Sequence, residues 1–299
     1  MLAYVLAVLA ACANAASSVL QRSANHKVPP GQNLSLRLIG SLVHEPVWFG
    51  GILAITAGFL LQASALGSGQ LSVVEPILVL ELPATLWLAA RVFGPRMHRR
   101  EWCATVAMTA GLAGLLYFLS PSAGHPARVP WYSWVTGIGI NLVFAAAMVA
   151  LGRRRPAGGS AGRNGDGAYR AALLGIAAGS TFGLTAALMK GMTATFSQGM
   201  LTLLTSWPLY AMIAAGALGM FFTQSALNAG RLIAAQPGLT LADPIASILW
   251  GILIFGERVR GGWFIAPAVI SGLLMAAAVV LLARSPVLSS ANGPAPADR

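Results

Sequence analysis

Residues 70–93 read QLSVVEPILVLELPATLWLAARVF, and residues 231–254 read RLIAAQPGLTLADPIASILWGILI. Both stretches are apolar and long enough to cross a bilayer as a helix of roughly 20 residues. A shift of 161 positions superposes the two prolines of the first stretch on those of the second. The matched pairs are Pro76 with Pro237 and Pro83 with Pro244. Because proline removes a backbone donor and crowds the carbonyl four residues earlier, the pair predicts a duplicated membrane helix broken at these prolines.

Acidic side chains lie inside these apolar stretches, and the two copies differ in where they carry them. Glu75 aligns with Gln236, whereas Asp243 aligns with a leucine. Glu81 has no acidic counterpart in the second copy. A carboxylate at the centre of a bilayer costs roughly 2.5–3.5 kcal/mol on insertion scales, so it is rarely without a role. Two interpretations stay open for each acid: it binds a substrate or ion, or it specifies helix packing through an internal hydrogen bond or ion pair.

The composition is that of a membrane protein. Apolar residues make up 57% of the chain and charged residues 9%, against about 25% charged in soluble domains. A net charge of +11 suggests nucleic acid at first, but the basic residues lie between apolar segments and form no basic face. They are typical of orientation charges in a multi-pass protein, so we expect the lipid bilayer and no nucleic acid as a partner.

The apolar runs predict an all-α integral membrane protein with nine transmembrane helices. They are expected at about 2–20, 47–66, 70–93, 102–119, 131–151, 169–189, 203–229, 232–255 and 263–283. Residues 31–46 are short and polar, with leucines near one helical face, which is typical of an amphipathic helix in the interface. The alternative is that this segment is a tenth span.

The basic residues also predict the orientation. Fifteen of the nineteen Lys and Arg residues fall on one side of the predicted spans. Cytoplasmic loops are enriched in Lys and Arg, so this side, with the C-terminus, is expected in the cytoplasm and the protein in the inner membrane.

The duplication extends well beyond the broken helix. Without a gap, residues 60–116 match 221–277 at fifteen positions, including Trp102 with Trp263. An odd number of spans between two even units inverts the second copy, which is the plan of secondary transporters with a site near the bilayer midplane. The predicted parts are a first four-helix repeat (1–120), a connecting helix with a basic linker (121–168), a second four-helix repeat (169–283) and a disordered tail (284–299).

The second repeat closes with Ala226-Leu227, Pro237, Pro244 and then Phe255-Gly256-Glu257. This order resembles the EamA-like proteins of the drug/metabolite transporter superfamily. The nine-span layout, with Met189-Lys190-Gly191 and Thr223-Gln224, is most similar to the NIPA-type magnesium transporter branch. The first repeat departs from the pattern, since Gly94-Pro95-Arg96 stands where the Gly-Glu pair is expected. The resemblance implies a substrate pathway between the two halves.

Uncharged polar groups and one lysine complete the candidate site. We expect Gln62 and Gln224, which both precede an Ala-Leu pair, to line the pathway, together with Gln236. Lys190 is either a pathway or gate residue or a lysine whose stem reaches out to the interface.

These patterns predict a secondary transporter of a small metabolite or cationic solute, coupled to a proton or cation. Backbone carbonyls freed by the prolines are available to a cation beside Glu75 and Asp243. No nucleotide, hydrolase or metalloprotease motif occurs, so we expect no enzyme activity and no cofactor. The alternatives are a magnesium or divalent cation permease, whose metal ligands the sequence leaves unknown, and a non-transporting scaffold or lipid-modifying protein. A homodimer is compatible with every one of these interpretations.

Overall fold

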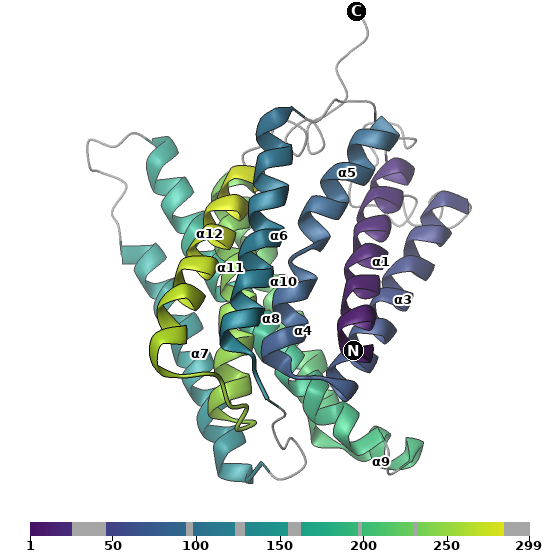
Figure 1. Cartoon of the computed structure of the whole chain (residues 1–299), viewed down its shortest axis with the longest axis vertical. Helices are drawn as coiled ribbons and strands as arrows, with labels where there is room; N and C mark the ends of the chain where they lie inside the picture. The colour runs from purple at the N-terminus through teal and green to yellow at the C-terminus, as the bar shows by residue number, and fades with distance from the viewer. Residues whose placement is uncertain are drawn as a thin grey trace, which may run out of the picture.

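The computed structural model describes residues 1–25, 46–93, 98–122, 129–154, 163–196, 199–229 and 232–283. These residues form helices and contain no strand (Figure 1). The first half holds α1 (Leu2–Asn25), α3 (Pro46–Ser68), α4 (Leu71–Leu78), α5 (Glu81–Phe93) and α6 (Arg99–Leu119). The second half holds α7 (Trp131–Arg154), α8 (Arg163–Phe196), α9 (Met200–Thr205), α10 (Trp207–Ala229), α11 (Leu232–Leu253), the 3₁₀ turn η2 (Gly262–Phe264) and α12 (Ile265–Ala283).

The all-α membrane fold is confirmed. Within the described ranges, eight spans are long and apolar enough to cross a membrane, with α4 and α5 counted together as one. The remaining predicted span, 232–255, forms the 22-residue helix α11, which contains two prolines, Gln236 and Asp243. The number of spans therefore stays a prediction. The interfacial segment 31–46 and the tail 284–299 lie outside the described residues.

The first proline-containing stretch is broken into two helices. Between α4 and α5, Val79 N donates to Pro76 O at 3.3 Å, Leu80 N to Ile77 O at 3.0 Å and Leu82 N to Val79 O at 3.1 Å. These bonds reach back three residues where a regular α-helix reaches back four. The interruption predicted at Pro76 and Pro83 thus falls between the two prolines.

The second stretch is not broken in the same way. α11 continues through Pro237 and Pro244 as one helix, so the helix breaks predicted there are wrong. The physical reason lies in its neighbour α8, which presents glycines along the shared face. They are Gly175, Gly179 and Gly183, small residues that allow two helices to approach closely. A Cβ at Gly183 would lie 2.7 Å from Ala246 Cβ and 2.9 Å from Asp243 O, so α8 holds the backbone of α11 in close contact through both prolines.

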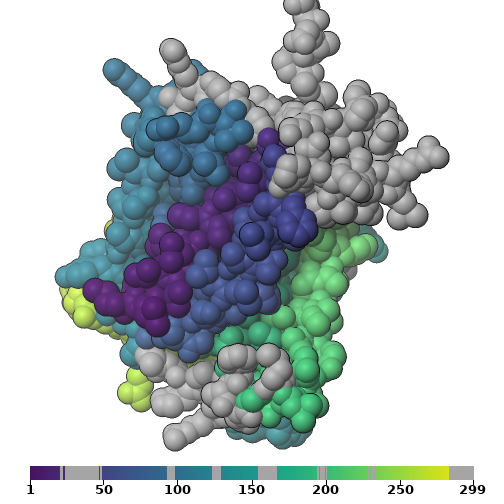
Figure 2. Space-filling model, turned by 90° about the vertical axis from the view of Figure 1, so that its right-hand side faces the viewer, coloured from purple at the N-terminus to yellow at the C-terminus, as the bar shows by residue number. Residues whose placement is uncertain are grey.

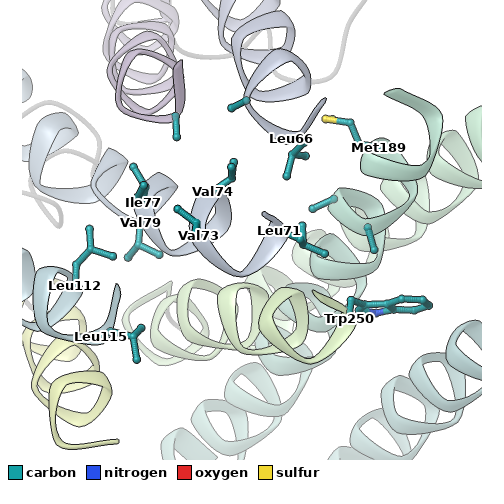
Figure 3. Packing of buried hydrophobic residues seen from close by; sticks show 14 of the residues in the cluster. Leu66, Leu71, Val73, Val74, Ile77, Val79, Leu112, Leu115, Met189 and Trp250 are labelled. Atoms are coloured by element: carbon teal, nitrogen blue, oxygen red, sulfur yellow. The ribbon is translucent and has the colours of Figure 1, made fainter. Parts of the chain in front are cut away.

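The short helix α4 lies at the centre of the packed interior. Every residue from Leu71 to Ile77 is buried. Figure 3 shows Leu71, Val73 and Val74 of α4 among apolar side chains from several other helices, Trp250 of α11 among them. α4 packs against α1, α8 and α11, so elements from both halves of the chain surround it.

Helices pair in a regular way around this centre. α1 packs along α3 and α8 packs along α10, whereas α6 packs along α12 of the other half. α1 and α3 lie side by side across one face of the molecule (Figure 2). In Figure 1, α1 begins in the lower half, whereas α8 ends in the lower part, next to α9.

We expect Gly183→Val to lower the free energy of unfolding by about 1–3 kcal/mol, because overpacking a tight interface forces backbone shifts. The matched control is Gly139→Val on α7, where a new Cβ would meet no atom within 4 Å. Thermal unfolding of both purified variants in detergent gives the comparison. Equal melting temperatures for the two variants would show that the α8–α11 seam does not depend on glycine.

Candidate functional site

Three acidic side chains from the two proline-containing stretches lie near one another. Glu75 of α4 is buried, with 4% of its surface exposed. The charge of Asp243 on α11 acts on Glu75, and the charge of Glu81 at the start of α5 acts on Asp243. The structure thus brings together the carboxylates that the sequence singles out. We call Glu75, Glu81 and Asp243 the carboxylate cluster.

Amide side chains from two further helices also act on the cluster. Gln62 Nε2 of α3 donates a hydrogen bond of 3.0 Å to Glu75 Oε1. The side chain of Asn14 on α1 lies close enough to Glu81 to act on its carboxylate. α1, α3, α4, α5 and α11 therefore all contribute a polar group, and the break between α4 and α5 separates Glu75 from Glu81.

Two oxygens at this place have no hydrogen-bond partner within the described part of the chain. They are Asp243 Oδ1 and Ser247 Oγ, one helical turn apart on α11. Ser247 is fully buried and lies close enough to Asp243 to act on its carboxylate, although the pair does not reach hydrogen-bonding geometry. Buried polar atoms are nearly always hydrogen-bonded in proteins, so two unsatisfied oxygens, one of them on an acid of the cluster, call for an explanation.

The described residues contain no group of three or more His, Cys, Asp or Glu side chains arranged to hold a metal ion. The three acids alternate instead with amides and a hydroxyl. The acids offer hydrogen-bond acceptors to a ligand, and the amides and the hydroxyl offer donors.

Lys190 does not reach out to the interface, so that alternative is wrong. Its side chain on α8 is buried, with 3% of the residue exposed. Nζ lies 2.8 Å from Glu257 Oε1 and donates a second bond of 2.8 Å to Gly69 O. It also lies 5.5 Å from the centre of the Phe255 ring. Lys190 is therefore part of a separate ion-pair site and not of the carboxylate cluster.

Glu257 is the functional group that our sequence reasoning left out of the site. Its Oε1 accepts a hydrogen bond of 2.7 Å from Leu71 N, and Oε2 accepts one of 3.0 Å from Ser72 N and another from Ser72 Oγ. It thus caps the N-terminus of α4 although 186 residues separate it from Leu71. The available signal was its place in the Phe255-Gly256-Glu257 motif.

The turn after α11 aims the Glu257 carboxylate. Gly256 has φ +67°, a conformation that side chains with a Cβ rarely adopt. Glu257 N then donates to Gly251 O at 2.9 Å, which folds the chain back against the end of α11. The motif therefore has a geometric reason: glycine makes the turn that points the following glutamate at α4.

A cluster of aromatic rings packs beside this ion-pair site. Trp134 of α7 packs against Trp207, Trp250 and Phe255, with ring centres 5.3, 5.7 and 5.6 Å apart. These rings border the Lys190 side, because Phe255 contacts the ammonium group. The ion pair consequently lies in apolar surroundings, where an unpaired charge would be expensive.

Two predicted site residues have hydrogen-bond partners other than the carboxylates. Gln224 is exposed on α10, and its amide donates to Met220 Sδ at 3.7 Å. Gln236 donates to Thr240 Oγ1 at 3.4 Å within α11. Gln62 and Gln224 occupy neighbouring positions in the repeat alignment, yet only Gln62 bonds to a carboxylate.

The fold and the site define a multi-pass helical membrane protein with ionisable groups buried among its helices. No family model matches the chain, and no solved structure matches it. The chain is 29% identical over 301 residues to an uncharacterized protein of Corynebacterium glutamicum. The alignment covers 96% of this chain and 98% of that protein, so the similarity extends over the whole architecture.

We expect Gln62→Leu to destabilise the protein by about 1–3 kcal/mol, because it leaves the buried Glu75 carboxylate without its hydrogen-bond donor. Gln224→Leu is the matched control, since that glutamine is exposed and bonds only weakly to sulfur. Thermal unfolding of the two purified variants measures the difference. If both unfold at the wild-type temperature, the Gln62–Glu75 bond contributes nothing to stability.

Proposed function

We propose that the chain is a secondary transporter of the drug/metabolite type that moves a small cationic solute or metabolite across the inner membrane by alternating access. The observation that carries the proposal is the carboxylate cluster, where acids from both proline-containing stretches lie near one another and where Asp243 Oδ1 and Ser247 Oγ are unsatisfied. Intramembrane acids that face a shared interior are typical of substrate and ion pathways.

Charge balance supports a positively charged ligand. Lys190 is the buried base of the described residues, and Glu257 already neutralises it. No Lys or Arg within that part of the chain pairs with Glu75, Glu81 or Asp243. Three carboxylates cannot all stay ionised in a low-dielectric interior without positive charge, so the cluster takes up protons, a cation, or one in exchange for the other.

The helix arrangement supports two inverted repeats around this site. α1 packs along α3 in the first half as α8 packs along α10 in the second, and α6 packs along α12 between the halves. α1 begins in the part of the molecule where α8 ends, as inversion requires (Figure 1). In such transporters, one repeat rocks against the other around a site near the midplane.

Magnesium is the second candidate substrate, and the carboxylate cluster is the observation that favours it. Mg²⁺ keeps several of its waters and needs only one or two protein carboxylates, so a compact ligand set is unnecessary. Thermal unfolding in the presence of organic amines and of MgCl₂ separates the candidates, because a ligand that binds the native state raises its stability. A rise in the unfolding temperature with amines alone supports transport of an organic cation. A rise with MgCl₂ alone supports a magnesium permease.

Neutralising the cluster is expected to abolish transport. Asp243→Asn and Glu75→Gln should each lower uptake into proteoliposomes at least about tenfold, a factor that corresponds to about 1.4 kcal/mol. Both variants should insert normally, because a neutral amide is easier to bury than a carboxylate. The control is Glu101→Gln, a buried glutamate that accepts from His98 N at 2.7 Å at the start of α6, away from the cluster. Wild-type transport by Asp243→Asn would refute the proposal.

We further expect the C-terminus in the cytoplasm. Fifteen of the nineteen Lys and Arg residues fall on the side of the predicted spans that is expected to hold the C-terminus. By the positive-inside rule, a fluorescent protein fused after Arg299 should fluoresce and a fused periplasmic phosphatase should stay inactive. The opposite pair of results would invert the assigned orientation.

A further inference from the structure

We propose that Lys190 and Glu257 form a latch that joins the two halves of the protein and holds the N-terminus of α4 in its buried position. The latch consists of Gly69, Leu71 and Ser72 from the first half and Lys190 and Glu257 from the second. It goes beyond the proposed function, which needs only the carboxylate cluster.

The latch bonds connect the halves at one place. Glu257 accepts from the backbone of Leu71 and Ser72 and from the Ser72 hydroxyl, and Lys190 donates to Gly69 O. Every one of these bonds joins the chain before or within α4 to a residue more than 100 positions later. Since α4 has only eight residues, its first turn is a large part of the helix, and Glu257 holds that turn.

The bonding pattern makes Glu257 the central member of the latch. Its carboxylate meets two backbone donors that the start of any helix leaves free, and its negative charge suits a helix N-terminus. Lys190 neutralises that charge in apolar surroundings. Removing Glu257 leaves the lysine without its counter-charge and the free N–H groups without an acceptor. Removing Lys190 leaves the carboxylate with its backbone donors. Loss of Glu257 is therefore the larger perturbation.

The structure also gives α4 a place to bend. The turn at Val79 and Leu80 separates α4 from α5, so α4 can move while α5 stays. Glu75 lies on α4, between this turn and the latch. If the proposed function holds, release of the latch therefore moves one acid of the carboxylate cluster relative to Asp243 on α11.

The rate at which a buried cysteine on α4 is modified measures how firmly the latch holds α4 in its buried position. In a Cys12→Ala, Cys103→Ala background, Val74→Cys places a thiol on α4 where the wild-type side chain is fully buried; we call it the α4 reporter. Val279→Cys places an equally buried thiol, the α12 reporter, on a helix that packs mainly along α6. Both single-cysteine proteins are treated in detergent with a small charged methanethiosulfonate, without any transported solute.

We expect Glu257→Gln to raise the modification rate of the α4 reporter at least about tenfold, which corresponds to about 1.4 kcal/mol of closing free energy. The rate of the α12 reporter should stay at its starting value, because only α4 is released. Lys190→Met should raise the rate of the α4 reporter less than Glu257→Gln. Ser72→Ala, which removes one hydroxyl and leaves the ion pair intact, should give the smallest rise and keeps the test valid if the charge variants fail to fold.

Two results would overturn the latch. One is an unchanged rate of the α4 reporter in every latch variant that folds; the other is a parallel rise at both reporters, which would show general loosening of the fold. Gln62→Leu serves as the destabilised control, since it weakens α4 packing through Glu75 without touching the latch. The measurement needs no transport, so the latch can stand if Asp243→Asn transports normally, and it can fail while the transporter assignment holds.

Discussion

The cap that Glu257 places on α4 is the interaction on which the rest of the interior depends. A helix that begins inside a membrane protein exposes backbone N–H groups that lipid cannot satisfy. Here Leu71 N and Ser72 N point at a carboxylate from the far end of the chain. That carboxylate is itself too costly to bury alone, and Lys190 offsets its charge. The short helix α4 thus needs the Glu257 carboxylate as its cap, and the buried carboxylate needs Lys190 to neutralise its charge.

The two copies of the repeated stretch use their prolines differently because their surroundings differ. α11 rests against the glycine face of α8, and this close packing keeps it in one piece through Pro237 and Pro244. The first stretch meets larger side chains, such as Leu112 and Trp250 in Figure 3, and breaks into α4 and α5. Internal symmetry of the sequence therefore sets the helix order, while local packing decides which copy breaks.

The sequence predicts the span positions well, because bilayer thickness and apolar composition leave few alternatives for segments such as α6 or α7. It also singles out Glu75 and Asp243, since an acid in an apolar helix needs a partner or a ligand. It does not predict that Glu257 caps α4, because the contact spans 186 positions and Arg96 replaces the glutamate in the first repeat. Nor does it separate Gln62 from Gln224. Their local sequences agree, and only tertiary packing puts one on a carboxylate and leaves the other exposed.

The protein buries two sets of charged groups, and the contrast between them bears on how the molecule can respond to a ligand. The latch is balanced, since each charge has an opposite charge and the remaining bonds go to backbone atoms and one hydroxyl. The carboxylate cluster has acids without a base and oxygens without partners among the described residues. Binding a further charge at a balanced site releases little electrostatic free energy. At an unbalanced site of acids, a cation or proton is attracted by charges that no base neutralises. Because α4 carries Glu75 and is capped by Glu257, the free energy of a cation or proton taken up at the carboxylate cluster would act on the same short helix that the latch holds.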